Sequence, residues 1–382
     1  RSWSYMKFPH LRSLGAEPVL SVRGDRSSLL RYGVPAGAAV VKADAYGLGV
    51  SRVGPALARA GCRHFFVAQL PEGATLRQAL RDKPTNTTIY VLNGLLETDR
   101  LSFEVHGLVP CLNDLGQVER WSALARRRGT MLPAALQLDT GMNRLGLPRT
   151  ELDTLVAEPE RLAGIDLRLI MSHLACADEP DHPMNRIQLD RFKRAVTRLP
   201  HGRVSLAASS GIFLGGDFLF DLVRPGVALY GANPTPGKPN PMGQVVRLQG
   251  KILQVRGVDR GESVGYGASH RFTRPRLIAT VGVGYADGFL RSSSDRGSAV
   301  LGGMPAPIVG RVSMDLITID VSDAPEELAR PGAMVDLIGA DAAFAGKGRT
   351  LEDVAASAGT IPYEILTSLG PRYERRYLGG IA

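Results

Sequence analysis

A lysine ends a short apolar run in the stretch VVKADAYGLG, residues 40–49. Lys42 is either a surface residue whose ammonium reaches water, as most lysines are, or an amine that reacts with an aldehyde. An amine condenses with an aldehyde only when neutral, so a reactive Lys42 needs surroundings that lower a pKa normally near ~10.4, or it is already bound as an imine. The glycines that follow, Gly47 and Gly49, favour the reactive interpretation.

Three more side chains have the right chemistry but an ordinary explanation when each is taken alone. Arg224 in VRPG fits a salt-bridging arginine, and His173 after LRLIMS fits a structural histidine. Tyr266 in GYG fits a core aromatic, although its flanking glycines would weaken a packing strand. A common site for these residues therefore depends on the elements that carry them.

Those elements follow a regular alternation of short apolar runs and longer helical patterns, which is typical of βαβ units. Eight runs favour a closed (β/α)8 barrel over an open, doubly wound sheet, and active sites of such barrels form at the carboxyl ends of the strands, where Lys42 stands. Helices are predicted over 51–61, 114–129 and 185–199, among others. The predicted strands are 38–42, 64–68, 88–92, 107–112, 134–138, 167–172, 203–207 and 220–224.

A stretch rich in proline and glycine, NPTPGKPNPMG at residues 233–243, cannot continue a helix or a central strand. We therefore predict a barrel domain over 1–236 and a β-rich C-terminal domain over 237–382, in which Thr350 and Asp353 cap a short helix. Because residue 1 is Arg, the first ~15 residues are left out of this interpretation.

The composition is that of an ordinary globular protein, with 44% apolar and 22% charged residues in a chain of 382. A net charge of +9 can indicate a nucleic-acid or membrane partner, but the basic residues are scattered and not interleaved with aromatics, so neither is expected. No run approaches the ~20 apolar residues of a spanning helix. Three cysteines without C-x-x-C spacing suggest a reducing compartment, hence the cytoplasm, and no metal site.

The stretch KADAYGLG resembles the cofactor-lysine motif of the alanine racemases, pyridoxal-phosphate enzymes that combine a (β/α)8 barrel with a β-rich C-terminal domain. Seven further blocks look like family blocks in the family order, and the resemblance covers the chain from Ala38 to the end. They are LDTGMNRLG, MSHLACADE, VRPGVALYG, VGYGASH, VGVGYADGF, GRVSMDL and IPYEILTSLGPRYERRYLGG.

The resemblance implies a homodimer with shared active sites. Lys42 would hold pyridoxal phosphate and move the α-proton of the substrate on one face, while Tyr266 of the partner subunit would do so on the opposite face. Racemisation needs this pair, because a single base must return the proton to the face from which it came unless the planar carbanion turns over.

It also implies the residues that hold the cofactor. Arg224 would hydrogen-bond the ring nitrogen and keep it unprotonated, and His173 would support Arg224. Helix N-termini near the last barrel strands suit a phosphate. The phosphate contacts would be the amides of Gly226 and Val227 and the hydroxyls of Ser210, Tyr46 and Tyr363.

The substrate contacts follow from the same resemblance. Arg144 in GMNR would contact both the cofactor phenolate and the substrate carboxylate, which suits a permanently charged, bidentate guanidinium. The amide of Met314 would bind the same carboxylate, and Tyr285 with Tyr363 would narrow the entrance around a methyl-sized side chain.

Two positions depart from the family pattern. Leu48 replaces a common histidine, a change expected to affect outer packing only. Gln137 stands where many members carry a lysine that becomes carbamylated, so another group must position Arg144. The segment before Lys42 is also shorter than usual.

Together these features predict a homodimeric pyridoxal-phosphate racemase that interconverts L- and D-alanine, for wall peptide synthesis or D-alanine breakdown. A broad-specificity or serine racemase of the same build is the nearest alternative. A decarboxylase of this fold type would not need both Lys42 and Tyr266, and a non-catalytic cofactor carrier would lack the second domain.

Overall fold

The structure is a computed structural model of the chain and describes residues 19–23, 37–81, 86–96, 100–341 and 347–378. The chain forms two compact units. The barrel unit comprises 21–247, 350–369 and 375–382, and the sheet unit comprises 1–20, 248–349 and 370–374. The division differs from the predicted boundary after residue 236, because the barrel unit extends to Arg247 and includes 350–369. Most of the segment that precedes Lys42 lies outside the described residues.

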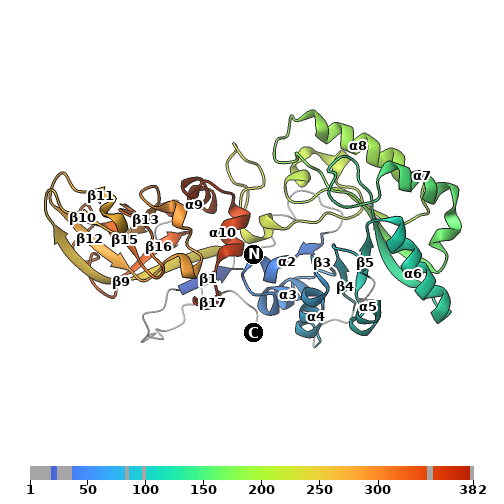
Figure 1. Ribbon diagram of the computed structural model, residues 1–382, viewed down its shortest axis with the longest axis horizontal. Coiled ribbons are helices and arrows are strands. Elements are labelled where there is room, and N and C mark those ends of the chain that lie inside the picture. The colour runs from blue at the N-terminus through green and yellow to red at the C-terminus, as the bar shows by residue number, and fades with distance from the viewer. Residues whose placement is uncertain (1–18, 24–36, 82–85, 97–99, 342–346, 379–382) are drawn as a thin grey trace, which may run out of the picture. The chain divides into compact units, whose positions relative to one another are not determined.

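Seven parallel strands in the order β2-β3-β4-β5-β6-β7-β8 form the sheet of the barrel unit (Figure 1). Parallel strands covered on both faces are apolar throughout, and the side chains of Phe65, Phe66 and Val67 in β3 are fully buried. The strands are β2 (Ala39–Val40), β3 (His64–Val67), β4 (Thr88–Val91), β5 (Val109–Leu112), β6 (Leu132–Gln137), β7 (Ile165–Met171) and β8 (Arg203–Ser205).

The eighth predicted strand, 220–224, is reduced to single bridges that nevertheless complete the ring. Val223 pairs with Gly37 before β2, and Arg224 pairs with Ala208 after β8, both in parallel. Pro225 follows, and because proline has no N–H to donate, the segment cannot continue a two-sided ladder. The prediction of an α/β barrel followed by a β-rich part is confirmed, whereas the predicted last strand does not form as a strand.

Helices around the outside of the strands cover the sheet (Figure 1). The Asp114 carboxylate caps α6 by accepting from the Gln117 N–H at 2.7 Å, and Gly129 ends the helix in the left-handed conformation, close to the predicted bounds. The helices are α2 (Lys42–Tyr46), α3 (Val50–Arg59), α4 (Leu70–Ala79), α5 (Arg100–His106), α6 (Leu115–Arg128), α7 (Arg149–Ala157) and α8 (Pro183–Val196).

Two short helices late in the chain, α9 (Leu351–Ala358) and α10 (Pro362–Ser368), also belong to the barrel unit. The predicted cap of α9 is confirmed: the Thr350 hydroxyl accepts from the Asp353 N–H at 3.1 Å, and the Asp353 carboxylate accepts from the Thr350 N–H at 2.9 Å. This reciprocal pair satisfies two amides that the first helical turn leaves free.

The sheet unit is built from antiparallel strands. The long β9 (Val246–Val258) pairs with β12 on one side and β16 on the other, β15 pairs with β12, and β13 pairs with β14 and β16. Val258, Phe272, Ile278 and Val309 form one of its apolar clusters. The other strands are β10 (Ser263–Val264), β11 (His270–Arg271), β12 (Arg276–Val281), β13 (Ser298–Leu301), β14 (Met304–Pro307), β15 (Ile317–Asp320) and β16 (Met334–Ile338), with β1 (Val19–Arg23) and β17 (Glu374–Leu378) crossing the division between the units.

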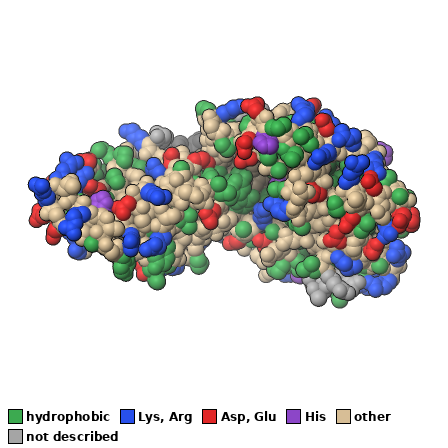
Figure 2. Space-filling model, turned by 45° about the horizontal axis from the view of Figure 1, so that its top comes forward, with side chains coloured by type: hydrophobic (Ala, Val, Ile, Leu, Met, Phe, Trp, Pro, Cys, Tyr) green, Lys and Arg blue, Asp and Glu red, His purple; other side chains and the backbone are tan. Residues whose placement is uncertain are grey.

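The surface charge is mixed in both units. Figure 2 shows Lys and Arg side chains interspersed with Asp and Glu over the face presented, in each unit taken by itself. Among the described residues, no helix has the length and hydropathy needed to cross a membrane.

Candidate active site

Lys42, Arg144, His173 and Arg224 all follow the carboxyl ends of barrel segments: β2, β6, β7 and the bridge at Val223. Parallel strands end at the same edge of the barrel, so these side chains share one face of it. That face is therefore the candidate active site of the barrel unit.

The amine of Lys42 is shifted toward its neutral form. Burial and then the charge of Arg144 lower the pKa of Lys42, while the charge of Glu72 opposes the shift. The two oxygens of Glu72 accept backbone N–H bonds from Ala43 at 2.6 Å and Ala68 at 2.7 Å. A lowered pKa is the condition for a nucleophilic or proton-accepting lysine.

The residues after Lys42 form a left-handed turn. The φ angles of Ala43, Asp44, Ala45 and Tyr46 lie between 52° and 55°, a conformation that costs roughly 1–2 kcal/mol per L-residue. Contacts from outside the turn hold it: the Glu72 bond to Ala43, and the Asp44 carboxylate, which accepts from the Val50 N–H at 2.7 Å. The turn fixes the backbone that carries both the lysine and Tyr46.

Tyr46 lies in an aromatic cluster beside Gly226. Its ring centroid is 4.7 Å from that of Tyr230 and 6.1 Å from that of Tyr363 in α10. A Cβ on Gly226 would stand 2.3 Å from the Tyr46 hydroxyl oxygen, so only glycine fits there. Burial raises the pKa values of Tyr46 and Tyr363, which keeps both phenols neutral and able to donate hydrogen bonds.

The neighbouring serines divide their roles in a way that the sequence did not reveal. The buried hydroxyl of Ser209 accepts from the Gly226 N–H at 2.9 Å and from the Ala228 N–H at 3.3 Å. The predicted phosphate ligand Ser210 is half-buried at the start of the next turn, η3 (Ser210–Leu214). Ser209 therefore fixes the loop before η5 (Val227–Tyr230), and the Gly226 amide is already paired.

Arg224 is buried, with only 3% of its surface exposed, and is held by neutral acceptors. Its Nη2 donates to the Ser172 carbonyl at 2.6 Å and lies 3.5 Å from Nδ1 of His173, and its Nη1 donates to the Ser205 hydroxyl. Burial lowers the pKa of Arg224 to about 10, which still leaves it charged at neutral pH.

His173 is neutral in this setting. Burial, followed by the charges of Arg224, Arg144 and Lys42, lowers the pKa of His173 to about 3. Since an arginine only donates, Nδ1 of His173 is the acceptor of this contact and the ring proton lies on Nε2.

A polar network behind His173 was not anticipated from the sequence. Gln188 of α8 donates to the His173 carbonyl at 2.9 Å and to the Thr140 hydroxyl at 3.1 Å, and accepts from the Ala175 N–H at 2.8 Å. Thr140 in turn contacts the Ser172 hydroxyl at 2.8 Å. Gln188 therefore ties the turn after β7 to the loop after β6.

That loop carries the exposed Arg144. One Asp139 oxygen accepts from three successive amides, those of Gly141, Met142 and Asn143, at 2.8–3.2 Å. Gln137 donates to the Leu145 carbonyl at 3.2 Å. Gln137 thus braces the backbone next to Arg144 instead of its guanidinium.

The other three predicted residues belong to the sheet unit. Tyr266 is 69% exposed in a turn whose glycines, Gly265 and Gly267, have φ of 78° and 72°. The Ala286 N–H donates to the Met314 carbonyl at 2.9 Å, which brings the exposed Tyr285 and Met314 together. Within the described part of the chain, no group of three or more His, Cys, Asp or Glu could hold a metal ion.

Comparison with known proteins agrees with this fold. Residues 28–234 match the alanine racemase N-terminal domain, and residues 245–377 match the alanine racemase C-terminal domain. The chain belongs to the alanine racemase family.

The relatives match over nearly their full length. An alanine racemase of Rhodospirillum rubrum is 54% identical over 344 residues, 90% of this chain and 89% of the relative. A catabolic alanine racemase of Agrobacterium fabrum is 50% identical over 341 residues, 89% of this chain and 85% of the relative.

Solved structures resemble the chain equally fully. The crystal structure of a Bartonella henselae alanine racemase with covalently bound pyridoxal phosphate has a TM-score of 0.88 and 40% identity, covering 95% of this chain and 100% of that one. The biosynthetic alanine racemase of Pseudomonas aeruginosa has a TM-score of 0.84 and 33% identity, covering 95% and 99%.

Proposed function

We propose that this protein is a pyridoxal-phosphate-dependent alanine racemase that interconverts L- and D-alanine. The observation that carries the proposal is the position of Lys42. Lys42, whose pKa is lowered, follows strand β2 at the edge of the barrel that also holds Arg224 and the Gly226 loop. The family and the cofactor bound in a relative of 40% identity support the same assignment.

The residues present fit the cofactor. The loop at Gly226 is a cradle in which a Cβ would strike Tyr46, and neutral phenols of Tyr46 and Tyr363 stand beside it. The Ser210 hydroxyl and the Val227 amide complete the proposed phosphate site, at the start of a short helix where an anion is favoured. Ser209 holds the cradle in shape.

When bound, pyridoxal phosphate withdraws electrons from the α-carbon of the substrate and so makes the α-proton acidic. Lys42 Nζ would take or return that proton on one face, because its lowered pKa leaves part of the amine free to accept it. Tyr266 of the partner subunit would serve the opposite face, and its exposure in the sheet unit supports a role at a subunit interface.

Arg224 would hold the cofactor's ring nitrogen by donating to it. The buried guanidinium only donates hydrogen bonds and cannot accept one, so it would pair with an unprotonated ring nitrogen and thereby limit side reactions. His173, neutral and within 3.5 Å, positions Arg224 without adding a competing charge.

Arg144, the Met314 amide and the two entrance tyrosines, Tyr285 and Tyr363, would recognise the substrate. The loop bonds from Asp139 and Gln137 would hold Arg144 where a carboxylate reaches it. A narrow entrance fits a methyl side chain, although one methylene is worth only ~1–3 kcal/mol of discrimination.

We further propose a homodimer in the cytoplasm. No disulfide joins the three cysteines, all of which lie in the described part of the chain, and this fits a reducing compartment. The catabolic and biosynthetic names among the relatives leave both metabolic directions open for this chain.

The decisive experiment follows the α-proton signal of L-alanine, L-serine and L-lysine by proton NMR in heavy water, with chiral analysis of the products. Rapid exchange with D-alanine appearing, and little change in the others, is expected. Comparable turnover of serine would identify the broad-specificity alternative. Exchange of the α-proton without formation of the other enantiomer would refute the two-base assignment. No exchange with the cofactor-loaded protein would refute the proposal that the protein is an amino-acid racemase.

A further inference from the structure

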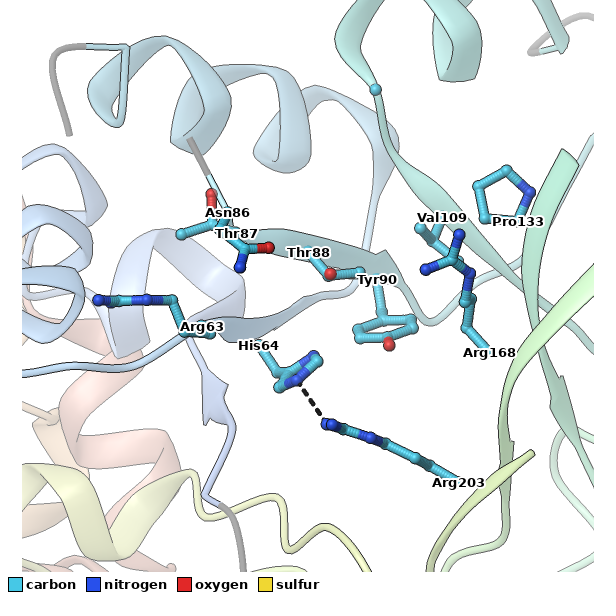
Figure 3. A pocket seen from close by; sticks show the side chains of 11 residues that line it. Arg63, His64, Asn86, Thr87, Thr88, Tyr90, Val109, Pro133, Arg168 and Arg203 are labelled. Atoms are coloured by element: carbon cyan, nitrogen blue, oxygen red, sulfur yellow. Dashed lines mark hydrogen bonds between the residues drawn. The ribbon is translucent and has the colours of Figure 1, made fainter. Parts of the chain in front are cut away.

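A pocket, shown in Figure 3, lies at the end of the barrel opposite the candidate active site. His64, Thr88 and Arg203 are the first residues of β3, β4 and β8, so the pocket opens at the amino ends of the strands. Its volume of about 500 Å³ falls in the range of small-molecule sites. Nothing in the proposed racemisation uses this pocket.

The lining of the pocket is basic. It includes three arginines and a histidine but, among the described residues, no aspartate or glutamate. Arg203 forms no ion pair with a carboxylate in that part of the chain, and its Nη1 lies 2.9 Å from Nε2 of His64. Arg168 pairs with Asp166 through Nε, which leaves its terminal nitrogens for another partner, whereas Arg63 is engaged by the carbonyls of Ala58 and Cys62.

The contact between Arg203 and His64 fixes the direction of the histidine's hydrogen bonds. A guanidinium can only donate, so Nε2 of His64 accepts and the ring proton lies on Nδ1. Nδ1 is buried and has no hydrogen-bond partner in the described structure. The pocket therefore contains a cation that lacks an anion, next to a histidine whose second ring nitrogen is buried without an acceptor.

Tyr90 adds a further donor. In Figure 3 its ring lies between the side chains of His64 and Arg168, and its hydroxyl faces the space that Arg203 borders. Burial raises the pKa of Tyr90 to about 12, so the hydroxyl keeps its proton. Burial and then the charge of Arg203 lower the pKa of His64, so the ring stays neutral and the cation of Arg203 is not matched by a negative group.

We propose that this pocket binds a small molecule through an oxyanion, a phosphate or carboxylate group, held by Arg203, Arg168 and the Tyr90 hydroxyl. Guanidinium groups bind both kinds of oxyanion in bidentate fashion, and among the described residues the only carboxylate that pairs with these side chains is that of Asp166, on Nε of Arg168. The volume exceeds what an inorganic ion alone requires, so the ligand is an organic molecule that carries such a group.

Calorimetric titration of the cofactor-loaded protein tests the proposal, because the cofactor then fills the phosphate site at the other end of the barrel. The probes are pyrophosphate for the phosphate class and citrate for the carboxylate class, at constant ionic strength set by sodium chloride. Saturable one-site binding of at least one probe is expected, and the tighter probe identifies the class. Heat equal to that of added chloride for both probes would overturn the proposal.

Two variants locate the site, and a third serves as the control. Arg203→Gln and Arg168→Gln should each weaken binding by about 10- to 100-fold, as expected for a lost charge-assisted hydrogen bond. Arg127→Gln removes the same charge from the exposed end of α6 and should leave binding unchanged. Equal affinity in all three variants would place the probe elsewhere and refute the assignment.

A spectroscopic readout separates direct binding from general charge effects. The Nδ1 resonance of His64 should shift on addition of the bound probe and not on addition of chloride. This measurement uses the wild-type protein, so it stands even if Arg203→Gln does not fold. Binding without a shift of this resonance would contradict the geometry argued here, while leaving the racemase proposal untouched.

Discussion

Gly226→Ala tests the geometry of the proposed phosphate cradle at a single atom. The added Cβ would lie 2.3 Å from the hydroxyl oxygen of Tyr46 and 3.1 Å from its Cζ. The φ angle of Gly226 is −120°, so no left-handed strain adds to the penalty of this contact. Tyr46 cannot retreat freely, because the tilted ring of Tyr230 packs against it with 4.7 Å between the ring centroids.

Overpacking of this kind costs about 1–3 kcal/mol of folding free energy. If the Tyr46 hydroxyl also contacts the cofactor phosphate, its displacement removes a charge-assisted hydrogen bond and should weaken cofactor binding by about 10- to 100-fold. The free energy of unfolding is measured by urea denaturation of the apoprotein, and the cofactor dissociation constant by absorbance titration.

Two further variants make the result interpretable. Gly216→Ala adds a methyl group where nothing lies within 4 Å, so it should leave both quantities unchanged. Tyr46→Phe combined with Gly226→Ala removes the closest contact and should recover stability but not cofactor affinity. If Gly226→Ala alone matches the wild type in both measurements, the Tyr46 hydroxyl does not occupy this position and the cradle is wrong.

Three other predictions follow from individual contacts. Lys42→Ala should lower the rate of α-proton exchange by at least about 10²–10⁴-fold, and a rate within tenfold of wild type would exclude Lys42 as a base. Because burial and nearby cations lower the pKa of His173 to about 3, the folded protein leaves it neutral where the unfolded chain protonates it near ~6.5. Its contribution to stability is therefore intact above pH ~6.5 and is lost as the pH falls toward 3. When urea denaturation is repeated at several pH values in this range, the free energy of unfolding of His173→Gln should fall less steeply with decreasing pH than that of the wild type. Thr350→Ala breaks the reciprocal cap of α9 and should cost about 0.5–2 kcal/mol in urea denaturation. Thr154→Ala removes only a hydroxyl that donates to the Thr150 carbonyl within α7, so it should change stability by less than about 0.5 kcal/mol.

The barrel could be predicted because its signals are local. Apolar runs such as HFFV and TIYV are long enough to mark buried strands, and Asp114 and Gly129 mark the ends of α6. The eighth strand was overestimated because the apolar pattern of 220–224 says nothing about pairing. Only the hydrogen bonds of Val223 and Arg224 to opposite neighbours show where the ring closes.

The left-handed turn after Lys42 could not be predicted in the same way. Its four residues include two alanines, which favour right-handed helix, and none of the four is glycine. The contacts that hold the turn come from Glu72, in the next helical unit, and from the packing of Tyr46 on Tyr230, far along the chain. Ser209 and Ser210 present the same difficulty, since adjacent serines differ only in which hydroxyl the loop turns inward.

The electrostatics of the candidate site explain why a neutral Gln137 is compatible with the proposed chemistry. Lys42, Arg144 and Arg224 all act on the pKa of His173, so their charges add at one edge of the barrel. Glu72 is the acid that opposes the shift of Lys42, and its oxygens are already occupied by backbone amides. The side chain of Gln137 is a neutral amide that donates to the Leu145 carbonyl, so it does not offset this positive charge. The excess positive charge is therefore left for ligands to balance. In the proposed site, a cofactor phosphate and a substrate carboxylate would supply that balance, and a neutral Gln137 would leave the site more attractive to an amino acid's carboxylate than an anionic side chain there.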